Sequence, residues 1–344
     1  MADPRAKEGA ALTLDRPGAP GPETLFIEAI RQALHDEMER DERVIVLGED
    51  VGAFGGAFRA TEGLLARFGE GRVIDTPISE EAVVGGAVGA ALRGLRPVAE
   101  MQFMDFVSRG FDLLVNFAAK YRYRTGLGVP MVLRGPCGAG VHGGPFHSQS
   151  PEAFFTHVPG LKVVFPATAP DAKGLLVAAI RDDDPVLFFE HKYLYRRVRG
   201  RIPAGEHLVP IGVAAVRRPG RDLTIVTYGA MLWTALDGAE ELSREGIEAE
   251  VLDLRTLLPL DERAILASVG RTSKCLVLHE DTRTGGVGAE IAALLAEKAF
   301  ERLDAPVVRV TAPDTPVPFS PPLEEAFLPN TRTLVSAARQ LAAY

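Results

Sequence analysis

Helical and strand patterns alternate along almost the whole sequence, and this alternation constrains the fold more than any other feature. From Thr24 onward, short runs such as VIVLG (44–48) and PVLFFE (185–190) are almost entirely apolar. Between them lie amphipathic stretches such as 24–41, in which apolar residues recur every four positions. Apolar strands with helices between them are typical of a parallel sheet covered on both faces. The sequence therefore predicts a doubly wound α/β fold.

The alternation falls into two runs, separated at 193–212 by a basic stretch that is broken by Pro and Gly. With 344 residues, the chain is longer than one usual hydrophobic core supports. We therefore expect two doubly wound α/β domains, at 24–200 and 201–344. Residues 1–23, rich in Ala, Pro and Gly, are expected to form a flexible lead-in.

Composition and charge argue against several classes of partner. The formal net charge is -8 and no basic block or stripe is present, so neither nucleic acid nor an anionic membrane is an expected partner. No apolar run reaches the ~20 residues that span a bilayer. Cys137 and Cys275 lie far apart in sequence and form neither a disulfide framework nor a metal motif. This cysteine usage indicates a reduced, cytoplasmic setting.

The stretch RVIDTPISEEAVVGGAVGAALRG (72–94) raises the first question of chemistry. A short strand and a Pro turn lead into a helix that opens with Glu80 and Glu81 and is otherwise made of small apolar residues. Unpaired N–H groups and the helix dipole favour carboxylates there, so capping alone explains them. Because ligands of α/β sheets bind at the carboxyl edge, Glu80 could instead face a cleft and share a proton. The residues alone leave both interpretations open.

A glycine-rich stretch at 135–150 interrupts the alternation and ends in FHSQS. A compact α/β domain rarely contains so long a loop without a functional role. His147 is expected either to face a cleft or to be a surface or capping histidine. His142 is expected to be structural, and Cys137 to be a buried bystander rather than a nucleophile. No G-x-S-x-G motif surrounds the nearby serines, which argues against a serine nucleophile.

Two other glycine-rich segments resemble nucleotide-binding loops only superficially. GGAVGAALRG (85–94) and TGGVGAE (284–290) lack the G-x-G-x-x-G spacing directly after a strand, and no Walker motif is present. This argues against an NAD-linked oxidoreductase. The glycines are expected to serve packing, with 85–94 as a face that allows close approach of another helix or subunit.

Four segments together resemble the beta subunit of the decarboxylating component of 2-oxo acid dehydrogenase complexes. They are VIVLGEDVGAFGGAFRATEGL, DTPISEEAVVGGAVGAALRGLRPVAEMQF, FHSQSPEAFFTHVPGLKVVFPATAPDAKGLL and RDDDPVLFFEHKYLYR. The resemblance runs from about Thr24 to the C-terminus. It implies a transketolase-type pyrimidine-binding domain followed by a transketolase C-terminal domain. It also implies thiamine-diphosphate-dependent decarboxylation of a small 2-oxo acid, with transfer of the acyl group to the lipoamide of a transacylase.

The same resemblance assigns roles to individual residues. Glu80 matches the family glutamate that hydrogen-bonds N1′ of the cofactor's aminopyrimidine and so activates it. His147 matches the histidine that assists acyl transfer to lipoamide. Ile78, Gln102 and Phe106 match residues that line the aminopyrimidine.

The family also binds a potassium ion in this subunit, largely through backbone carbonyls. The matching positions are Met131, Ala179, Asp182 and Asp184. Asp184 stands where asparagine is usual, so a potassium site of altered charge, or none, is expected.

One motif of thiamine diphosphate enzymes is missing from this chain. There is no GDG sequence, the motif that binds the divalent metal holding the diphosphate. The oxygen ligands that Mg²⁺ prefers are then implied to come from an alpha subunit, which would share the cofactor in an α2β2 heterotetramer. The lipoyl transacylase is expected to dock on the C-terminal domain.

Two other functions are compatible with the same fold. A transketolase-like or sugar-phosphate synthase subunit would use the same cofactor, but its sugar-binding histidines are not evident. The joint presence of Glu80, Gln102, Phe106 and His147 argues against a non-catalytic structural partner. DTPISE occurs in pyruvate enzymes, whereas HSQSPEAFF is typical of branched-chain enzymes, and the substrate preference leans slightly to branched-chain 2-oxo acids.

Overall fold

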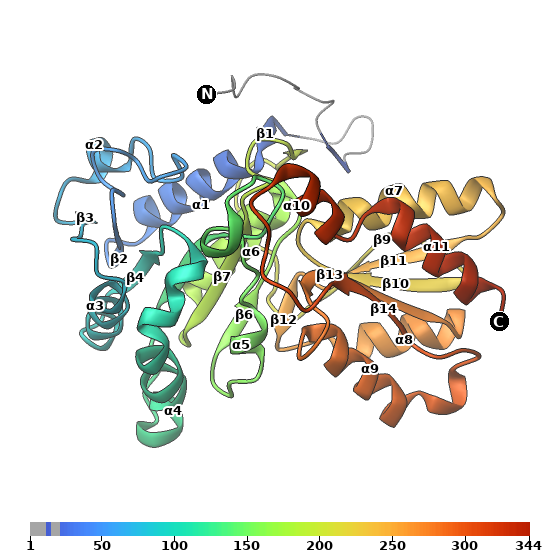
Figure 1. Cartoon of the computed structure of the whole chain (residues 1–344). Coiled ribbons are helices and arrows are strands. Elements are labelled where there is room, and N and C mark those ends of the chain that lie inside the picture. The colour runs from blue at the N-terminus through green and yellow to red at the C-terminus, as the bar shows by residue number, and fades with distance from the viewer. Residues whose placement is uncertain (1–11, 15–20) are drawn as a thin grey trace.

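The computed structural model describes residues 12–14 and 21–344 (Figure 1). Most of the expected lead-in, residues 1–23, lies outside the described residues. Among the described residues, Leu12 pairs with Val198, and β1 (Glu23–Leu25) pairs antiparallel with β8 (Arg199–Arg201). The stretch expected to separate the two domains thus forms a small two-stranded sheet with the start of the described chain.

Seven strands form the larger sheet, in the order β12-β6-β7-β5-β4-β2-β3. They are β2 (Val44–Gly48), β3 (Val73–Asp75), β4 (Arg96–Glu100), β5 (Val132–Cys137), β6 (Lys162–Val164), β7 (Val186–His191) and β12 (Thr256–Leu258). All neighbours are parallel except the edge strand β12. The parallel, doubly wound architecture predicted from the sequence is confirmed.

Helices cover both faces of this sheet (Figure 1). One face packs against α1 (Phe26–Arg40) and α6 (Ala169–Arg181), and the other against α3 (Glu80–Leu92). Strand residues alternate between the two faces: Val44 and Val46 join the first hydrophobic cluster, whereas Ile45 and Leu47 join the second. This alternation follows from the two-residue period of a strand.

Shorter elements follow several of the strands. These are α2 (Leu64–Phe68), the 3₁₀ helix η1 (Met104–Gly110), the π-helix η2 (Leu113–Ala118), α4 (Ala119–Thr125), the 3₁₀ turn η3 (Gly144–Phe146) and α5 (Ala153–Thr156). The sequence predicts a helix over the stretch FDLLVNFAAKYRYR, and the structure has a helix there whose residues Leu113–Ala118 form a π-helix. Such a widened turn displaces the side chains from a regular 3.6-residue period, which the sequence pattern did not reveal.

Five strands form the second sheet, in the order β14-β13-β10-β11-β9. They are β9 (Ala215–Arg218), β10 (Leu223–Thr227), β11 (Ala249–Asp253), β13 (Cys275–Thr282) and β14 (Val308–Ala312). Its helices are α7 (Met231–Arg244), α8 (Glu262–Thr272), α9 (Val287–Lys298), the 3₁₀ turn η4 (Phe300–Arg302), α10 (Pro321–Phe327) and α11 (Thr331–Ala342). α7 and α11 pack on one face, and α8 and α9 on the other (Figure 1).

The second half of the chain contributes one strand, β12, to the larger sheet. The sequence predicts a single strand over EAEVLDLRT, but Arg255 has a left-handed φ of 59° and turns the chain between β11 and β12. β12 then joins the first sheet, where the Phe165 N–H donates to the Arg255 carbonyl at 2.8 Å. The second half of the chain thereby completes the sheet of the first half. In the described part of the chain, no helix is long and apolar enough to cross a membrane.

Candidate active site

Three of the predicted site residues follow successive strands of the larger sheet. Glu80 opens α3 shortly after β3 ends, and Gln102 and Phe106 follow the end of β4. Since β3 and β4 both run parallel to β2, these residues lie at the carboxyl edge of the sheet. Ligands of open α/β sheets bind at this edge.

Glu80 is half-buried, and its carboxylate accepts no hydrogen bond from the described residues. The adjoining Glu81 is exposed. Ser79 occupies the N-cap of α3 without making a side-chain cap bond. The glutamate predicted to be a functional group is thus left without a partner at the site edge.

A second carboxyl group, Glu49, lies near Glu80. It directly follows β2, and only 7% of its surface is exposed. Burial, reinforced by the charge of Glu80, raises the pKa of Glu49. A desolvated carboxyl group beside a second negative charge keeps its proton more readily than an exposed carboxyl group does. Glu49 escaped the sequence analysis, although its place immediately after an apolar strand puts it at the ligand edge.

The structure brings His147 and Phe106 together. The His147 ring is edge-on to Phe103 and to Phe106, with centroids 4.6 and 5.5 Å apart. The two phenylalanine rings are themselves perpendicular, at 6.4 Å. Phe103 was missed from the sequence, although its spacing of three residues from Phe106 places both on one side of a 3₁₀ turn.

The other two predicted cofactor contacts are more open. Ile78 is 85% exposed, and nothing in the described chain covers it. Gln102 is half-buried, and its amide lies 3.5 Å from Oδ2 of Asp50. The exposed Ile78 and the weakly hydrogen-bonded amide of Gln102 are therefore accessible to a ligand at this edge.

The loop of His147 is fastened to the aromatic cluster by Asp105. The Gln149 N–H and side-chain amide both donate to Asp105 Oδ1, at 2.9 and 3.1 Å. Asp105 directly precedes Phe106 in η1. The bond therefore couples the end of the loop to the ring that His147 contacts.

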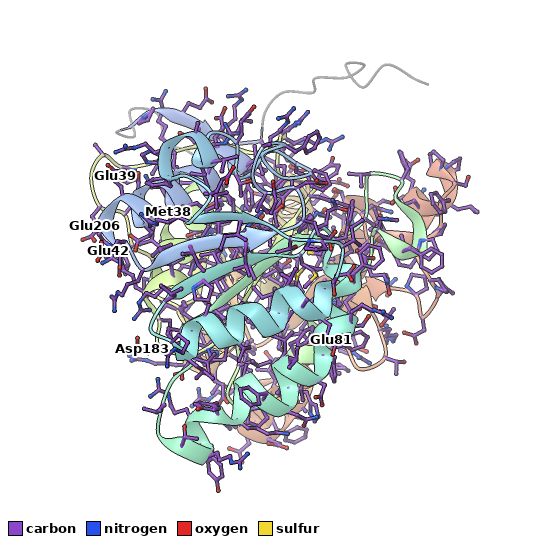
Figure 2. The ribbon with its side chains drawn as sticks, turned by 90° about the vertical axis from the view of Figure 1, so that its left-hand side faces the viewer. Met38, Glu39, Glu42, Glu81, Asp183 and Glu206 are labelled. Carbon is purple, nitrogen blue, oxygen red and sulfur yellow. The ribbon has the colours of Figure 1, made fainter. Side chains whose placement is uncertain are left out.

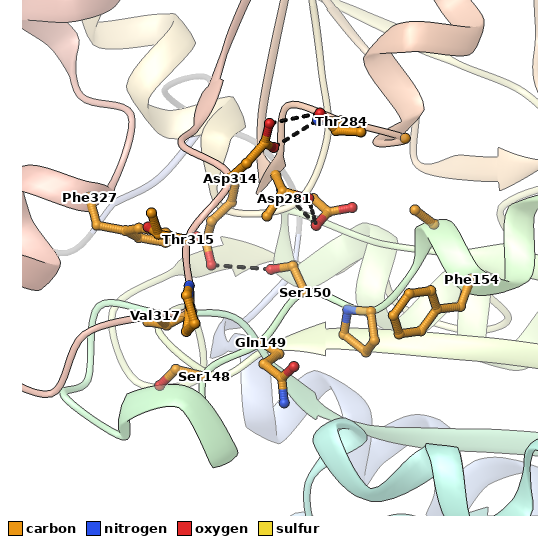
Figure 3. A pocket seen from close by; sticks show the side chains of 16 residues that line it. Ser148, Gln149, Ser150, Phe154, Asp281, Thr284, Asp314, Thr315, Val317 and Phe327 are labelled. Carbon is orange, nitrogen blue, oxygen red and sulfur yellow. Dashed lines mark hydrogen bonds between the residues drawn. The ribbon is translucent and has the colours of Figure 1, made fainter.

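A cavity of about 760 Å³ opens beside the same loop, between the two halves of the chain. Figure 3 shows Ser148, Gln149 and Ser150 on one side of it, with Asp281 and Asp314 on the other. Its ionisable lining residues are all acidic, and burial raises the pKa of Asp281 to about 6. The buried Ser148 hydroxyl has no hydrogen-bond partner in the part of the chain that the structure describes.

Cys137 is fully buried at the end of β5, and burial raises the pKa of its thiol well above the ordinary value. The thiol is therefore protonated at neutral pH, as expected of a bystander. Cys275 is also buried and free, and burial raises its pKa to about 12.

The predicted potassium residues lie at the opposite, amino edge of the sheet. The carbonyls of Met131 and Ala179 accept from Val186 and Asp182 N–H, at 3.0 and 3.3 Å. Lys162 Nζ donates to both oxygens of Asp182 at 2.6 Å.

Two arginines complete the contacts at this corner. Arg122 Nε donates to Asp184 Oδ1 at 2.5 Å. Arg96 donates to the carbonyls of Ile180 and Asp182, at 3.0 and 2.8 Å. Lys162 and Arg122 already neutralise the carboxylates of Asp182 and Asp184. The corner therefore fits an added potassium ion poorly, and the potassium site stays a prediction.

No group of three or more histidine, cysteine, aspartate or glutamate side chains across residues 12–14 and 21–344 is arranged to hold a metal ion.

Comparison with known families matches both halves of the chain. Residues 24–198 match the transketolase pyrimidine binding domain, and residues 212–334 match the transketolase C-terminal domain. A solved structure described as a split gene transketolase, inactive beta4 tetramer, has a TM-score of 0.75 at 24% identity. It covers 94% of this chain and 99% of its own. At that identity the likeness supports the fold alone.

Curated relatives match over nearly their full length. The 2-oxoisovalerate dehydrogenase subunit beta of Bacillus subtilis (strain 168) is 50% identical, covering 93% of this chain and 98% of the relative. The pyruvate dehydrogenase E1 component subunit beta of the same organism is 47% identical, over 92% and 98%. The acetoin:2,6-dichlorophenolindophenol oxidoreductase subunit beta of Cupriavidus necator is 46% identical, over 91% and 95%.

Proposed function

The chain belongs to the transketolase-type beta subunits of 2-oxo acid dehydrogenases, and on this premise we propose that it serves thiamine-diphosphate-dependent decarboxylation of a branched-chain 2-oxo acid. An enzyme of this class is an oxidoreductase. One observation carries the proposal: Phe106 and His147 meet edge to face at the sheet edge where the carboxylate of Glu80 has no hydrogen-bond or ion-pair partner among the described residues. The transketolase-like and non-catalytic alternatives are not favoured by the relatives.

Thiamine diphosphate fits the residues at this edge. When bound, it supplies the electron sink that decarboxylation requires. Glu80 would hydrogen-bond N1′ of its aminopyrimidine, and Phe106, Ile78 and Gln102 would contact the ring. The exposure of Ile78 and the free carboxylate of Glu80 support this assignment, because both groups are available to a planar, hydrogen-bonding ligand.

We further propose that an alpha subunit supplies the other half of the site in an α2β2 assembly. The sequence has no GDG motif, so Mg²⁺ and the diphosphate would be held by that chain. The outer face of α3 supports a close contact there: Gly86 and Gly89 are exposed, and a Cβ at Gly89 would meet nothing within 4 Å. Figure 2 looks onto α3, with Glu81 at its start. Internal packing does not require these glycines, each of which costs about 1 kcal/mol of helix propensity.

His147 is proposed to assist transfer of the acyl group to the lipoamide of the transacylase. Its imidazole lies against two aromatic rings, and a side chain that can both donate and accept a proton suits the transfer. The transacylase itself would dock on the second half of the chain. The buried free cysteines fit the proposed cytoplasmic location.

Activity of the assembled enzyme tests the proposal. Co-expression with a GDG-bearing alpha subunit should give a complex that reduces an artificial acceptor with 2-oxoisovalerate, at a higher kcat/KM than with pyruvate. Acetoin serves as the third substrate, because the three relatives named above have similar identities to this chain, between 46 and 50%. A higher kcat/KM for pyruvate or acetoin would contradict the proposed branched-chain substrate. Tight cofactor binding by the isolated chain would overturn the shared site.

A further inference from the structure

The glycine-rich loop that carries His147 has an unusual backbone and few internal hydrogen bonds, among them Gly138 N–H to the Gln149 carbonyl at 2.9 Å. Gly138, Gly140, His142 and Gly144 all have positive φ, between 61° and 85°. Glycine loses the most conformational freedom on folding, and a non-glycine residue in the left-handed region is disfavoured. Contacts from outside the loop therefore matter for the position of His147.

The first contact comes from Glu324 in α10, a carboxylate with only 1% of its surface exposed. Both of its oxygens accept from the His142 N–H, at 3.2 and 3.1 Å. Its Oε2 also lies 2.6 Å from His142 Nδ1. A buried carboxylate is costly unless it is hydrogen-bonded, and among the described residues the Glu324 side chain bonds only to this loop.

The second contact comes from Glu280 in β13. Its Oε1 accepts from the Ala139 N–H at 2.6 Å and from the Ser150 hydroxyl at 3.3 Å, which ties the two ends of the loop together. Its Oε2 lies 2.8 Å from Nε2 of the buried His191, which anchors the carboxylate to β7. Figure 3 shows the bond to Ser150.

Apolar packing from the second half completes the support. Ala139 packs with Ala312, Val317 and Phe327 in a separate small hydrophobic cluster. A side chain at Gly144 would collide with the ring of Phe319. The segment 312–328 thus covers the outer side of the loop, while Phe103 and Phe106 contact His147 on the inner side.

We propose that Glu324 and Glu280 are positioning residues for His147, so that the second half of the chain builds part of the active site. The inference rests on the proposed role of His147 in acyl transfer. Without these carboxylates, the loop would no longer present the imidazole against Phe103 and Phe106. Misplacement of a catalytic group by about 1 Å can cost ~10²-fold in rate. Decarboxylation, which depends on Glu80 rather than on this loop, should change little.

The experiment substitutes Glu324→Ala in the co-expressed complex, with Glu325→Ala as the matched control. Glu325 is the next residue and is exposed. Glu324→Ala should slow transfer to lipoamide by roughly 10-fold or more, and Glu325→Ala by less than about twofold. Glu324→Gln should recover part of the rate, because its amide oxygen can still accept from the His142 N–H.

A double-mutant cycle separates positioning from general damage. In the His147→Ala background, Glu324→Ala should add no further loss, because the group that it positions is already missing. Additive losses, or a Glu324→Ala rate equal to that of the control, would overturn the proposal. If His147→Ala slows both reactions equally, the transfer role fails, but the cycle still tests positioning in either assay.

A second variant with a smaller structural effect keeps the proposal testable if Glu324→Ala does not assemble. Phe319→Ala removes an exposed ring and leaves both carboxylates in place. It should give the same selective loss of transfer, by a few-fold, in a complex that still elutes as the wild-type assembly. Unchanged transfer in Phe319→Ala, where Glu324→Ala does not assemble, would also count against the proposal.

Discussion

Two pairs of carboxylates at opposite edges of the seven-stranded sheet differ in their partners. At the amino edge, Lys162 binds Asp182 and Arg122 binds Asp184, so each negative charge meets a cation. At the carboxyl edge, Glu80 has no cationic partner among the described residues, and the buried Glu49 lies beside it. The ion pairs of Asp182 and Asp184 contribute to the stability of the fold. Unpaired and desolvated charges destabilise a fold and persist where chemistry needs them.

The largest effect should follow loss of the unpaired carboxylate. Glu80→Gln should lower decarboxylation by the co-expressed complex by roughly 10²–10⁴-fold, the range for a group that holds a proton in the reaction. The matched control is Glu81→Gln, which removes the same charge from the same helical turn. If capping of α3 were the role of Glu80, the two variants would behave alike. Near-normal decarboxylation by Glu80→Gln in an assembled complex would refute its proposed role.

The second effect concerns the loop on the same edge. His147→Ala should slow acyl transfer to lipoamide by about 10²-fold, while decarboxylation measured with an artificial acceptor falls by only a few-fold. His157→Ala, at an exposed position ten residues later in the chain, is the control. An equal loss in both assays would point to substrate positioning rather than to transfer.

Local patterns predicted most of the fold. The spacing of apolar residues predicted α1, and continuous apolar runs predicted β2 and β7. These elements are predictable because the faces they bury determine which neighbouring residues are apolar. The sequence did not predict β12 as a separate strand. Its pairing depends on the left-handed turn at Arg255 and on a partner, β6, far away in the chain.

The site was predictable only in part. The position of Glu80 after a strand indicated its place at the edge, and the same rule would have found Glu49. The meeting of Phe106 and His147 was not predictable from spacing, because it depends on how the second half holds the loop. Glu324, one of two adjacent glutamates in PPLEEAFLP, gives no signal in the sequence that it is the buried one.

The paired edge should respond in stability alone. Lys162→Met removes the ammonium that lies 2.6 Å from Asp182 and 3.8 Å from Asp184, both half-buried, and should lower the free energy of unfolding by about 1–2 kcal/mol. Lys298→Met breaks an ion pair with Glu262 in which both side chains are about half exposed, at 50% and 48%. It should cost under about 0.5 kcal/mol. Urea unfolding measures both, and decarboxylation should be unchanged. A loss of activity in Lys162→Met would break the division between the two edges.

The smallest expected effect concerns potassium. Since Lys162 and Arg122 already neutralise Asp182 and Asp184, exchanging potassium for choline at constant ionic strength should shift the Tm of the complex by less than about 1 °C. A ligand stabilises only a state that binds it, and these oxygens already have partners. A potassium-specific rise in Tm that saturates with concentration would show a metal bound despite the two cations. The amino edge would then carry a site of its own, and the contrast with the carboxyl edge would fail.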